Sequence, residues 1–362
     1  MQKKTRNQHF VPRCLLRNFT SESNVVNIYD SSREKLRNPT SVDRVLSENY
    51  FYDKDNVVEN FLALYIEGPA SKVLNVIRGE SFEPLCLDGQ ISILRFIMVQ
   101  LSRTPSALST SLNTLQTLMD DVIKQLGTLN GFCEEITDNI KFSLNDPKDL
   151  LRMQTLDSVL EAPILIDLKW NFLINNTDND FVISDNPVIH YNWYLRNDDS
   201  IDSTGLTKKG VQIFLPLSNR ITLCLYDSQV YKVGEKGQHY TLVNNPEDVS
   251  ILNELQFRSR KSYIVFTQAE AADDVKRSCS KIPSNSLFTH HVDSSEVNIR
   301  GDKARSTIIQ WRKPYIFKNW LSFSKIKKKV LKREIRNEDR SPEMFAEHCQ
   351  KIQKLKSIAK AI

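Results

Sequence analysis

The sequence lacks most of the features that assign a function quickly. No stretch approaches the roughly 20 uncharged apolar residues of a membrane-spanning helix, and no apolar segment follows the basic N-terminus MQKKTRNQHF. Only 10 glycines and 13 prolines occur among 362 residues, which excludes a collagen-like or low-complexity chain. We therefore expect a globular protein that has no membrane contact and no secretory signal.

Familiar chemical motifs are missing as well. The six cysteines are scattered and form no CxxC pair, which disfavours a disulfide framework or a zinc finger and predicts a reducing, cytoplasmic environment. The phosphate-binding glycine loops, the metalloprotease sequence HExxH, the hydrolase sequence GxSxG and the kinase motifs do not occur. Any catalysis must therefore use residues outside these motifs.

Positive charge is concentrated at the two ends of the chain. The net charge is +5, yet residues 318–362 contain 13 Lys and Arg against 5 Asp and Glu, and the first 20 residues contain no acid. Basic patches attract phosphate backbones, although a solvated tail has the same composition. We expect nucleic-acid contact through the basic termini, or a protein partner bound by the C-terminal tail.

Hydrophobic periodicity predicts an α+β protein. Apolar residues at helical spacing predict a helix over residues 57–78, kinked or divided at Gly68-Pro69. The other predicted helices cover residues 88–103, 106–126, 147–161 and 246–260, and short β-branched runs predict strands near residues 164–176, 181–185, 211–218, 220–227 and 262–267. The expected organisation is one α+β domain over residues 1–316, helix-rich to 161 and strand-rich from 162, followed by a basic helical tail over 317–362.

The segment QHFVPRCLLRNF contains the first candidate site residue, His9. Its Val-Pro step is stiff and can start a short helix, on which Arg13 and Arg17 share one face. His9 would then be held in place just before the helix. It could act as an acid or base near neutral pH, or it could simply bind a carbonyl and fix the N-terminus.

Two other segments carry polar residues at the ends of elements. FVISDNPV places Asp185 and Asn186 after a buried strand, where they could form a turn or contribute to a site. LSRTP places Arg103 in the last turn of an apolar helix, where it could interact with the helix dipole, with an anion or with Asp185.

Two glutamates on one predicted helix are candidate metal ligands. Glu59 and Glu67 lie eight residues apart, so they share a face just before the Gly-Pro break. Exposed acids on a helix are the ordinary explanation. Together with Asp185 they could instead hold a divalent metal ion, because carboxylate oxygens are preferred ligands for such ions.

The order of these segments resembles a known family. QHFVPRCLLRNF, the helix with both glutamates, LSRTP, a tryptophan-bearing strand at Trp170, FVISDNPV and FLPLS occur in the order found in the domain-of-unknown-function family numbered 4238, which is widespread in bacteria. The resemblance covers about residues 6–270. The family pattern has an aromatic residue where this chain has Cys14 or Leu15. The positions that match its motifs are His9, Pro12, Arg103, Asp185, Asn186 and Pro187.

The leading functional prediction is a nuclease-like hydrolase of a phosphate-containing substrate, in a bacterial defence or toxin setting. His9 would be the acid or base, Asp185 would orient it or bind metal, and Arg103 would bind phosphate. Arg13, Arg17 and Asn186 would support substrate binding. One alternative is a non-catalytic binding module in which these residues form a structural network. Another is a regulatory subunit whose activity resides in a partner protein.

Overall fold

The structure is a computed structural model that describes residues 5–21, 24–79, 82–198, 203–299 and 302–361. It contains 44% helix and 20% strand, which confirms the α+β class. The α-helices are α1 (Arg13–Leu16), α2 (Val57–Phe61), α3 (Gly68–Arg78), α4 (Leu87–Ser102), α5 (Pro105–Leu129), α6 (Glu134–Asn139), α7 (Pro147–Leu160), α8 (Pro246–Ser259), α9 (Ala272–Lys281), α10 (Lys328–Leu331) and α11 (Pro342–Ala361). The 3-10 helices are η1 (Arg17–Phe19), η2 (Val42–Arg44), η4 (Ala162–Leu165) and η5 (Ala269–Ala271), and a π-helix, η3, covers Leu62–Glu67.

The strands form two larger sheets and several pairs. Their bounds are β1 (Asn7–His9), β2 (Val25–Asp30), β3 (Lys35–Ser41), β4 (Ser47–Asn49), β5 (Lys169–Asn175), β6 (Ile183–Ser184), β7 (Ile189–Tyr191), β8 (Gln212–Pro216), β9 (Ile221–Tyr226), β10 (Tyr231–Val233), β11 (Tyr240–Val243), β12 (Tyr263–Phe266), β13 (Phe288–Ile299), β14 (Asp302–Pro314) and β15 (Ser324–Ile326). The pairs are β1-β4, β10-β15 and β13-β14.

A five-stranded sheet of order β11-β5-β9-β8-β7 lies at the centre of the body. Every residue of β8 and β9 is buried, which explains their continuous apolar sequences. On one face, Phe172, Ile213 and Leu223 join the core formed with α3, α4 and the N-terminal segment. On the other face, Leu173 and Phe214 join a second core, to which α8 contributes. The sheet is thus a layer between two sets of helices.

A four-stranded sheet of order β3-β2-β12-β6 brings together strands from the N-terminal part of the chain and from the part near residue 265. Strand β2, near the N-terminus, pairs antiparallel with β12, and Val265 faces Ile28. Strand β6, which belongs to FVISDNPV, pairs with the other edge of β12. The helix-rich and strand-rich parts of the chain therefore share one sheet.

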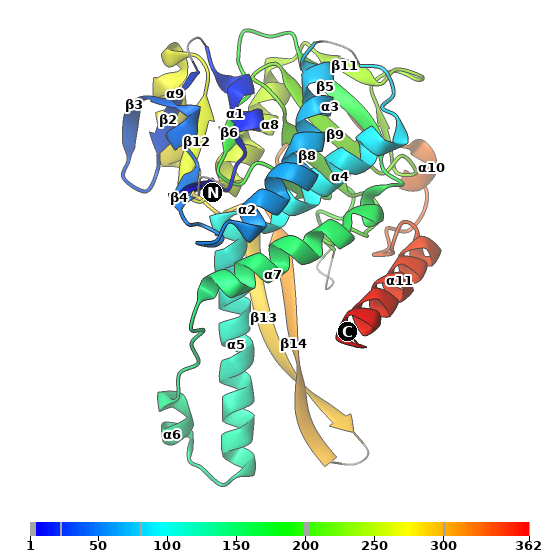
Figure 1. The fold of residues 1–362 in the computed structure, drawn as a ribbon. Coiled ribbons are helices and arrows are strands. Elements are labelled where there is room, and N and C mark those ends of the chain that lie inside the picture. The colour runs from blue at the N-terminus through cyan, green and yellow to red at the C-terminus, as the bar shows by residue number, and fades with distance from the viewer. Residues whose placement is uncertain (1–4, 22–23, 80–81, 199–202, 300–301, 362) are drawn as a thin grey trace.

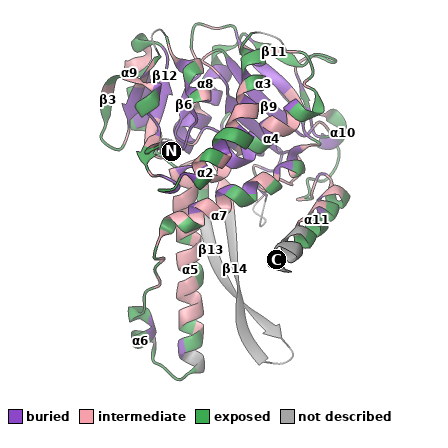
Figure 2. Cartoon of the chain, viewed as in Figure 1, coloured by how far each residue is buried: buried purple, intermediate pink, exposed green. Residues whose placement is uncertain are grey.

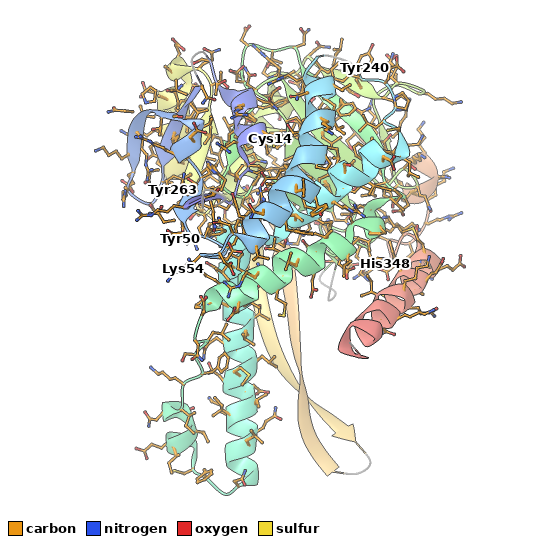
Figure 3. All side chains as sticks on the ribbon, viewed as in Figure 1. Cys14, Tyr50, Lys54, Tyr240, Tyr263 and His348 are labelled. Atoms are coloured by element: carbon orange, nitrogen blue, oxygen red, sulfur yellow. The ribbon has the colours of Figure 1, made fainter. Side chains whose placement is uncertain are left out.

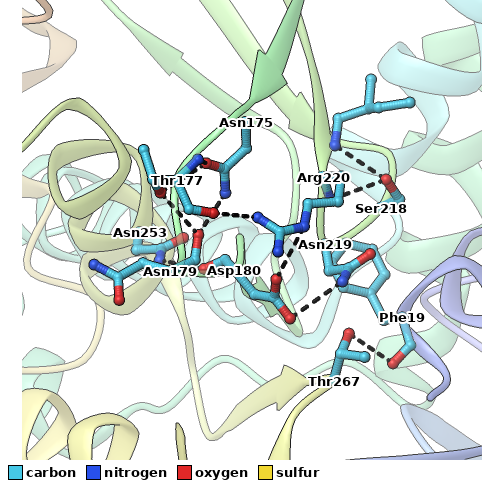
Figure 4. Close-up of polar contacts among 11 residues, drawn as sticks. Phe19, Asn175, Thr177, Asn179, Asp180, Ser218, Asn219, Arg220, Asn253 and Thr267 are labelled. Atoms are coloured by element: carbon cyan, nitrogen blue, oxygen red, sulfur yellow. Dashed lines mark hydrogen bonds and ion pairs between the residues drawn. The ribbon is translucent and has the colours of Figure 1, made fainter. Parts of the chain in front are cut away.

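The FLPLS motif ends in a turn that ties two loops together (Figure 4). The Ser218 hydroxyl accepts hydrogen bonds from the backbone N–H groups of Arg220 (3.1 Å) and Ile221 (3.0 Å). The Asn219 amide donates to the Asp180 carboxylate at 3.1 Å, and Arg220 forms an ion pair with the same carboxylate at 3.4 Å. These contacts fix the connection that leads into β6, so this motif has a structural role.

Two long elements project from the body in the same direction (Figure 1). Helix α5, followed by α6, extends beside the antiparallel hairpin of β13 and β14. Most residues of α5 are half-buried along its length, whereas the body contains many fully buried residues, drawn in purple (Figure 2). The sequence predicted the helix but no strand between residues 288 and 314. None of the helices in the described part of the chain is long and apolar enough to cross a membrane.

The segment after residue 316 packs on the body before it becomes helical. Phe317 and Leu321 are buried, and the Trp320 indole stacks on Trp193 with 5.1 Å between ring centroids. Within the basic helical tail expected over residues 317–362, the structure first has the strand β15 and the single turn α10. The expected final helix is present as α11. Residues 324–326 form a strand rather than a helix because their backbone pairs with β10.

Candidate functional site

The N-terminal strand places His9 inside the body. In the pairing of β1 with β4, His9 faces Ser47, and its side chain is only 8% exposed. Its Nε2 lies 3.1 Å from the carbonyl oxygen of Val42. Because a carbonyl only accepts, Nε2 must carry the hydrogen, which leaves Nδ1 as the basic atom of the neutral ring. Burial lowers the pKa of His9, so the neutral form persists below the usual range.

The neighbouring Gln8 connects this strand to the start of α2. Its buried Oε1 accepts hydrogen bonds from the backbone N–H groups of Tyr52 (2.8 Å) and Asp53 (3.3 Å), while its Nε2 donates to the Asp53 carbonyl at 2.8 Å. The Asp53 carboxylate in turn accepts from the N–H of Val58 at 2.6 Å and so caps the helix. The Tyr52 hydroxyl donates to the His9 carbonyl at 3.1 Å. The QH pair is therefore fixed relative to α2.

A π-helix then determines how the two glutamates are placed. The N–H of Gly68 donates to the carbonyl of Ala63, a five-residue span, and the following Pro69 has no N–H to continue an α-helical ladder. In a regular α-helix, positions eight apart differ by roughly 80° around the axis. The residue absorbed by the wider π-turn reduces that offset, so Glu59 and Glu67 come to the same side.

Arg103 completes the group from the end of α4. Its Nε donates to the carbonyl of Phe10 (3.2 Å) and to the Gln100 side chain (3.0 Å), and its Nη1 donates to Glu67 at 2.8 Å. The side chain is 1% exposed, and among the residues that the structure describes its Nη2 makes no hydrogen bond of good geometry, although the Tyr52 hydroxyl lies close enough for the guanidinium to act on its titration. A buried guanidinium N–H that lacks a partner is costly, and an anion bound beside it would remove that cost.

These residues form one electrostatic group, which we call the His9 cluster: His9, Glu59, Glu67 and Arg103. Burial, followed by the negative charge of Glu67, raises the pKa of Glu59 to about 7. The charges of Glu67 and Arg103 also act on His9. Cys14, on α1 beside α3 (Figure 3), belongs to the same environment, and burial raises its thiol pKa to about 12, so it stays protonated. A protonated thiol is a poor nucleophile.

A cavity of about 610 Å³ lies at the start of α2, where Val58 precedes Glu59 in the chain, and its lining residues include no member of the His9 cluster. Tyr52 and Asp53, the residues that hold Gln8, form part of its wall. Three basic side chains, Lys54, Lys148 and Arg152, line it together with the acids Asp53, Asp55 and Asp146. Figure 3 shows Lys54 and Tyr50 at the end of the body where this cavity lies.

Asp185 lies in a different environment from the one expected. Its carboxylate accepts three backbone hydrogen bonds, from Lys261 (2.8 Å), Ser262 (2.7 Å) and Tyr263 (3.0 Å), which fix the turn between α8 and β12. Burial raises its pKa to about 6, against the effect of these hydrogen bonds. It makes no hydrogen bond to His9, whose ring contacts Val42. The orienting role expected for Asp185 therefore has no geometric support, and its contacts are structural.

The other predicted residues divide in the same way. The Asn186 side chain accepts from the Thr104 hydroxyl at 3.1 Å and donates to the Ser259 hydroxyl at 2.9 Å, so it joins the end of α4 to α8 rather than facing a substrate. Arg13 is half-exposed and pairs with Asp43 at 3.0 Å. Arg17 is exposed on η1. Only Arg13 lies close enough to the His9 cluster to affect the titration of His9 and Glu59.

The predicted metal site lacks its third ligand, Asp185. Glu59 and Glu67 come together as expected, but Asp185 is bound elsewhere. Within the described ranges, no group of three or more His, Cys, Asp or Glu side chains is arranged to hold a metal ion. The sequence analysis also missed Tyr52 and Gln8, because neither belongs to a recognisable chemical motif. Their contacts with each other and with His9 depend on the pairing of β1 with β4, which the sequence does not predict.

The sequence also matches a family model over most of its length. The model for proteins of unknown function designated DUF4238 matches residues 7–270. The chain belongs to the DUF4238 family. No curated protein and no solved structure matches it. The part matched in this DUF4238 protein begins at β1 and includes the whole His9 cluster, whereas β13, β14 and the tail follow it.

Proposed function

We propose that this DUF4238 protein is a nuclease-like phosphodiester hydrolase that uses the His9 cluster for acid–base catalysis. The observation that carries the proposal is the placement of a carboxyl group with a pKa near 7, Glu59, beside a neutral histidine and a buried arginine with an unpartnered N–H. Environments that keep one group protonated and another neutral are typical of acid–base pairs.

In the proposed reaction, His9 Nδ1 accepts a proton from water as the water oxygen attacks phosphorus. Protonated Glu59 gives its proton to the leaving alkoxide, so the products are a phosphomonoester and an alcohol. Arg103 Nη2 binds a non-bridging phosphate oxygen, and Glu67 holds the guanidinium at 2.8 Å in the required position. Arg13 and the basic side chains of the cavity at the start of α2 bind the flanking phosphates.

This mechanism predicts a particular pH dependence. Glu59 must be protonated, so activity falls above pH 7, and His9 must be neutral, so activity also falls below its lowered pKa. The measurement is kcat/KM against pH on fluorescent single-stranded RNA and DNA and on duplex DNA. Assays with and without Mg²⁺ or Mn²⁺ test whether the adjacent carboxylates bind a metal.

Variants of the two reacting groups complete the test. We expect His9→Ala and Glu59→Gln each to lower kcat/KM by about 10²- to 10⁴-fold, and the Glu59→Gln profile to lose its alkaline limb. Glu270→Gln, an exposed carboxyl on η5, is the matched control. Equal cleavage by wild-type and His9→Ala proteins would remove the catalytic assignment. A bacterial defence or toxin role is tested separately, by phage plating and by growth after induction.

A binding module is the second candidate, and the low exposure of His9 and Arg103 favours it. In this case the cluster only joins β1 to α2 and α4, and the basic surfaces bind nucleic acid or a partner. The discriminating result is a Glu59→Gln protein that binds nucleic acid like the wild type while neither protein cleaves any substrate. Loss of nucleic-acid binding on deletion of residues 349–362 would place that contact in α11.

A further inference from the structure

A second cavity, of about 610 Å³, lies at the edge of the five-stranded sheet, and none of its lining residues belongs to the His9 cluster. Its wall is formed by β5, β9 and β10, by the segment before α4 and by the residue that follows β15. A volume of this size is typical of small-molecule sites. Of the motifs quoted from the sequence, only the tryptophan-bearing strand at Trp170 contributes to it, because the lining residues come from five separate segments.

Aromatic side chains form the inner wall of this cavity. Phe172 and Tyr231 are almost fully buried, and Tyr226 is 8% exposed. Trp170, which precedes them on β5, is only partly buried. Trp170 is thus less buried than these three aromatic residues, so its indole is the one of the four that a ligand in the cavity reaches most readily. An aromatic face in this position can stack on a planar ligand group.

Lysines dominate the rim. Lys169, Lys232, Lys236 and Lys327 line the cavity against two acids, Glu83 and Glu235. In the pairing of β10 with β15, Lys232 faces Lys325, and both side chains are exposed. Like charges directly opposite each other destabilise a strand pair. Within the part of the chain that the structure describes, neither lysine forms an ion pair. An anion between them would turn this repulsion into binding energy.

We propose that this cavity binds a nucleotide, with the base stacked on Trp170 and the phosphate held at the rim by Lys232 and by Lys325, which lies opposite Lys232 on β15 and outside the lining. Lys327 also lines the cavity, and its ammonium donates to the Ser228 carbonyl while adding positive charge there. The inference depends on the combination of groups. A bare phosphate would not interact with the aromatic residues, and an apolar ligand would not interact with the lysines. Stacking combined with cationic side chains is the usual way in which proteins bind a nucleotide unit without a glycine-rich loop. This site does not depend on the hydrolytic activity proposed above.

Tryptophan fluorescence tests the proposal directly. ATP and an eight-residue deoxythymidine oligonucleotide are the two probes, which distinguish a free nucleotide from a nucleotide within a strand. We expect saturable quenching by at least one of them, and loss of that quenching in Trp170→Phe. Quenching that persists in Trp170→Phe, or no binding of either probe, would overturn the proposal.

Charge variants provide a second readout that does not require a change in the core. Lys232→Glu is expected to weaken binding at least 10-fold, because it replaces an attraction to phosphate by a repulsion. Lys276→Glu, an exposed lysine on α9, changes the net charge equally and is expected to alter the affinity less than twofold. Two results would show non-specific attraction and overturn the proposal. One is equal weakening of binding by the two variants, and the other is an affinity for heparin and for inorganic phosphate equal to that for the nucleotide probe.

Discussion

At the residue scale, the main feature of this DUF4238 protein is a carboxyl group that is costly to ionise. Glu59 is partly buried beside Glu67, and its pKa is raised to about 7. In the unfolded chain the same group titrates near its ordinary value, so the folded state binds the proton more tightly. Its contribution to stability is therefore complete below that value and is lost as the pH rises to 7.

Replacement of Glu59 by glutamine should separate stability from function. Glutamine resembles the protonated carboxyl, so we expect Glu59→Gln to raise the free energy of unfolding at pH 8 by about 1–3 kcal/mol. At pH 4, where both groups are neutral, the difference should be within about 0.5 kcal/mol. Urea unfolding at the two pH values measures this, with Glu270→Gln as the exposed control. A glutamine variant that is less stable at pH 8 would contradict the raised pKa.

The single residues show how far the sequence could predict the site. His9 and Arg103 were candidates because they lie at the ends of predicted helices within the family motifs, and Glu59 and Glu67 because their spacing places them on one face of a predicted helix. The role of Asp185 could not be predicted, since its partners are backbone N–H groups of residues 261–263, more than 70 positions away. A carboxylate that satisfies a distant turn and one that orients a histidine have the same local sequence.

At the element scale, the long helical segment over residues 57–78 depends on its π-turn. The Gly-Pro step predicted a kink or a break there, and the structure has a wider turn that keeps α2, η3 and α3 in one continuous helical segment. The predicted helix starts at Asp146-Pro147 and Asn245-Pro246 are both confirmed, because each cap accepts a local backbone hydrogen bond. Strands β10 and β15 were not predicted, since three-residue strands have little periodicity of their own.

Glycine at position 68 is required by this geometry. A Cβ atom there would lie 3.0 Å from the Ala63 carbonyl oxygen, a backbone atom that cannot rotate away. We expect Gly68→Ala to lower the free energy of unfolding by about 1–2 kcal/mol despite the higher helix propensity of alanine. Gly79→Ala, whose nearest contact would be 3.4 Å, should change it by less than about 0.5 kcal/mol. The denaturant midpoints of the Gly68→Ala and Gly79→Ala proteins test this prediction. Equal midpoints would count against close packing of Gly68 in the π-turn.

At the scale of the whole molecule, the segment after residue 316 belongs partly to the body. Trp320 donates to Gln212 of the central sheet at 3.2 Å, and Arg340 binds the Asp167 carboxylate through two contacts of 3.0 Å. Composition alone could not reveal this, because lysine-rich sequence masks the few aromatic anchors. Much of its positive charge nevertheless stays at the surface, since Lys325, Lys328 and Lys329 are exposed.

Truncation should locate the end of the cooperative unit. A chain that ends at residue 348 keeps the aromatic anchors and Arg340, so it should unfold in a single transition close to that of the full chain. A chain that ends at residue 316 exposes Tyr191 and Trp193 and loses Phe317 and Leu321, so it should aggregate or unfold at a much lower temperature. Calorimetry and size-exclusion chromatography would measure both. Normal folding of the shorter chain would show that residues 317–348 are peripheral.

The pairing of β2 with β12 has a consequence for biosynthesis. The Thr267 hydroxyl binds the Phe19 carbonyl across 248 positions, and Asn18 binds the Leu217 carbonyl across 199. At roughly 5–20 residues per second, the ribosome needs about 10–50 seconds to supply these partners after the N-terminal segment has emerged. During that interval β2 has β3 beside it and α1 has η2 and α3, but the surfaces that later contact β12 and the end of β8 remain uncovered. The nascent chain should therefore require a holding chaperone, and its yield should rise when translation of the last third is fast.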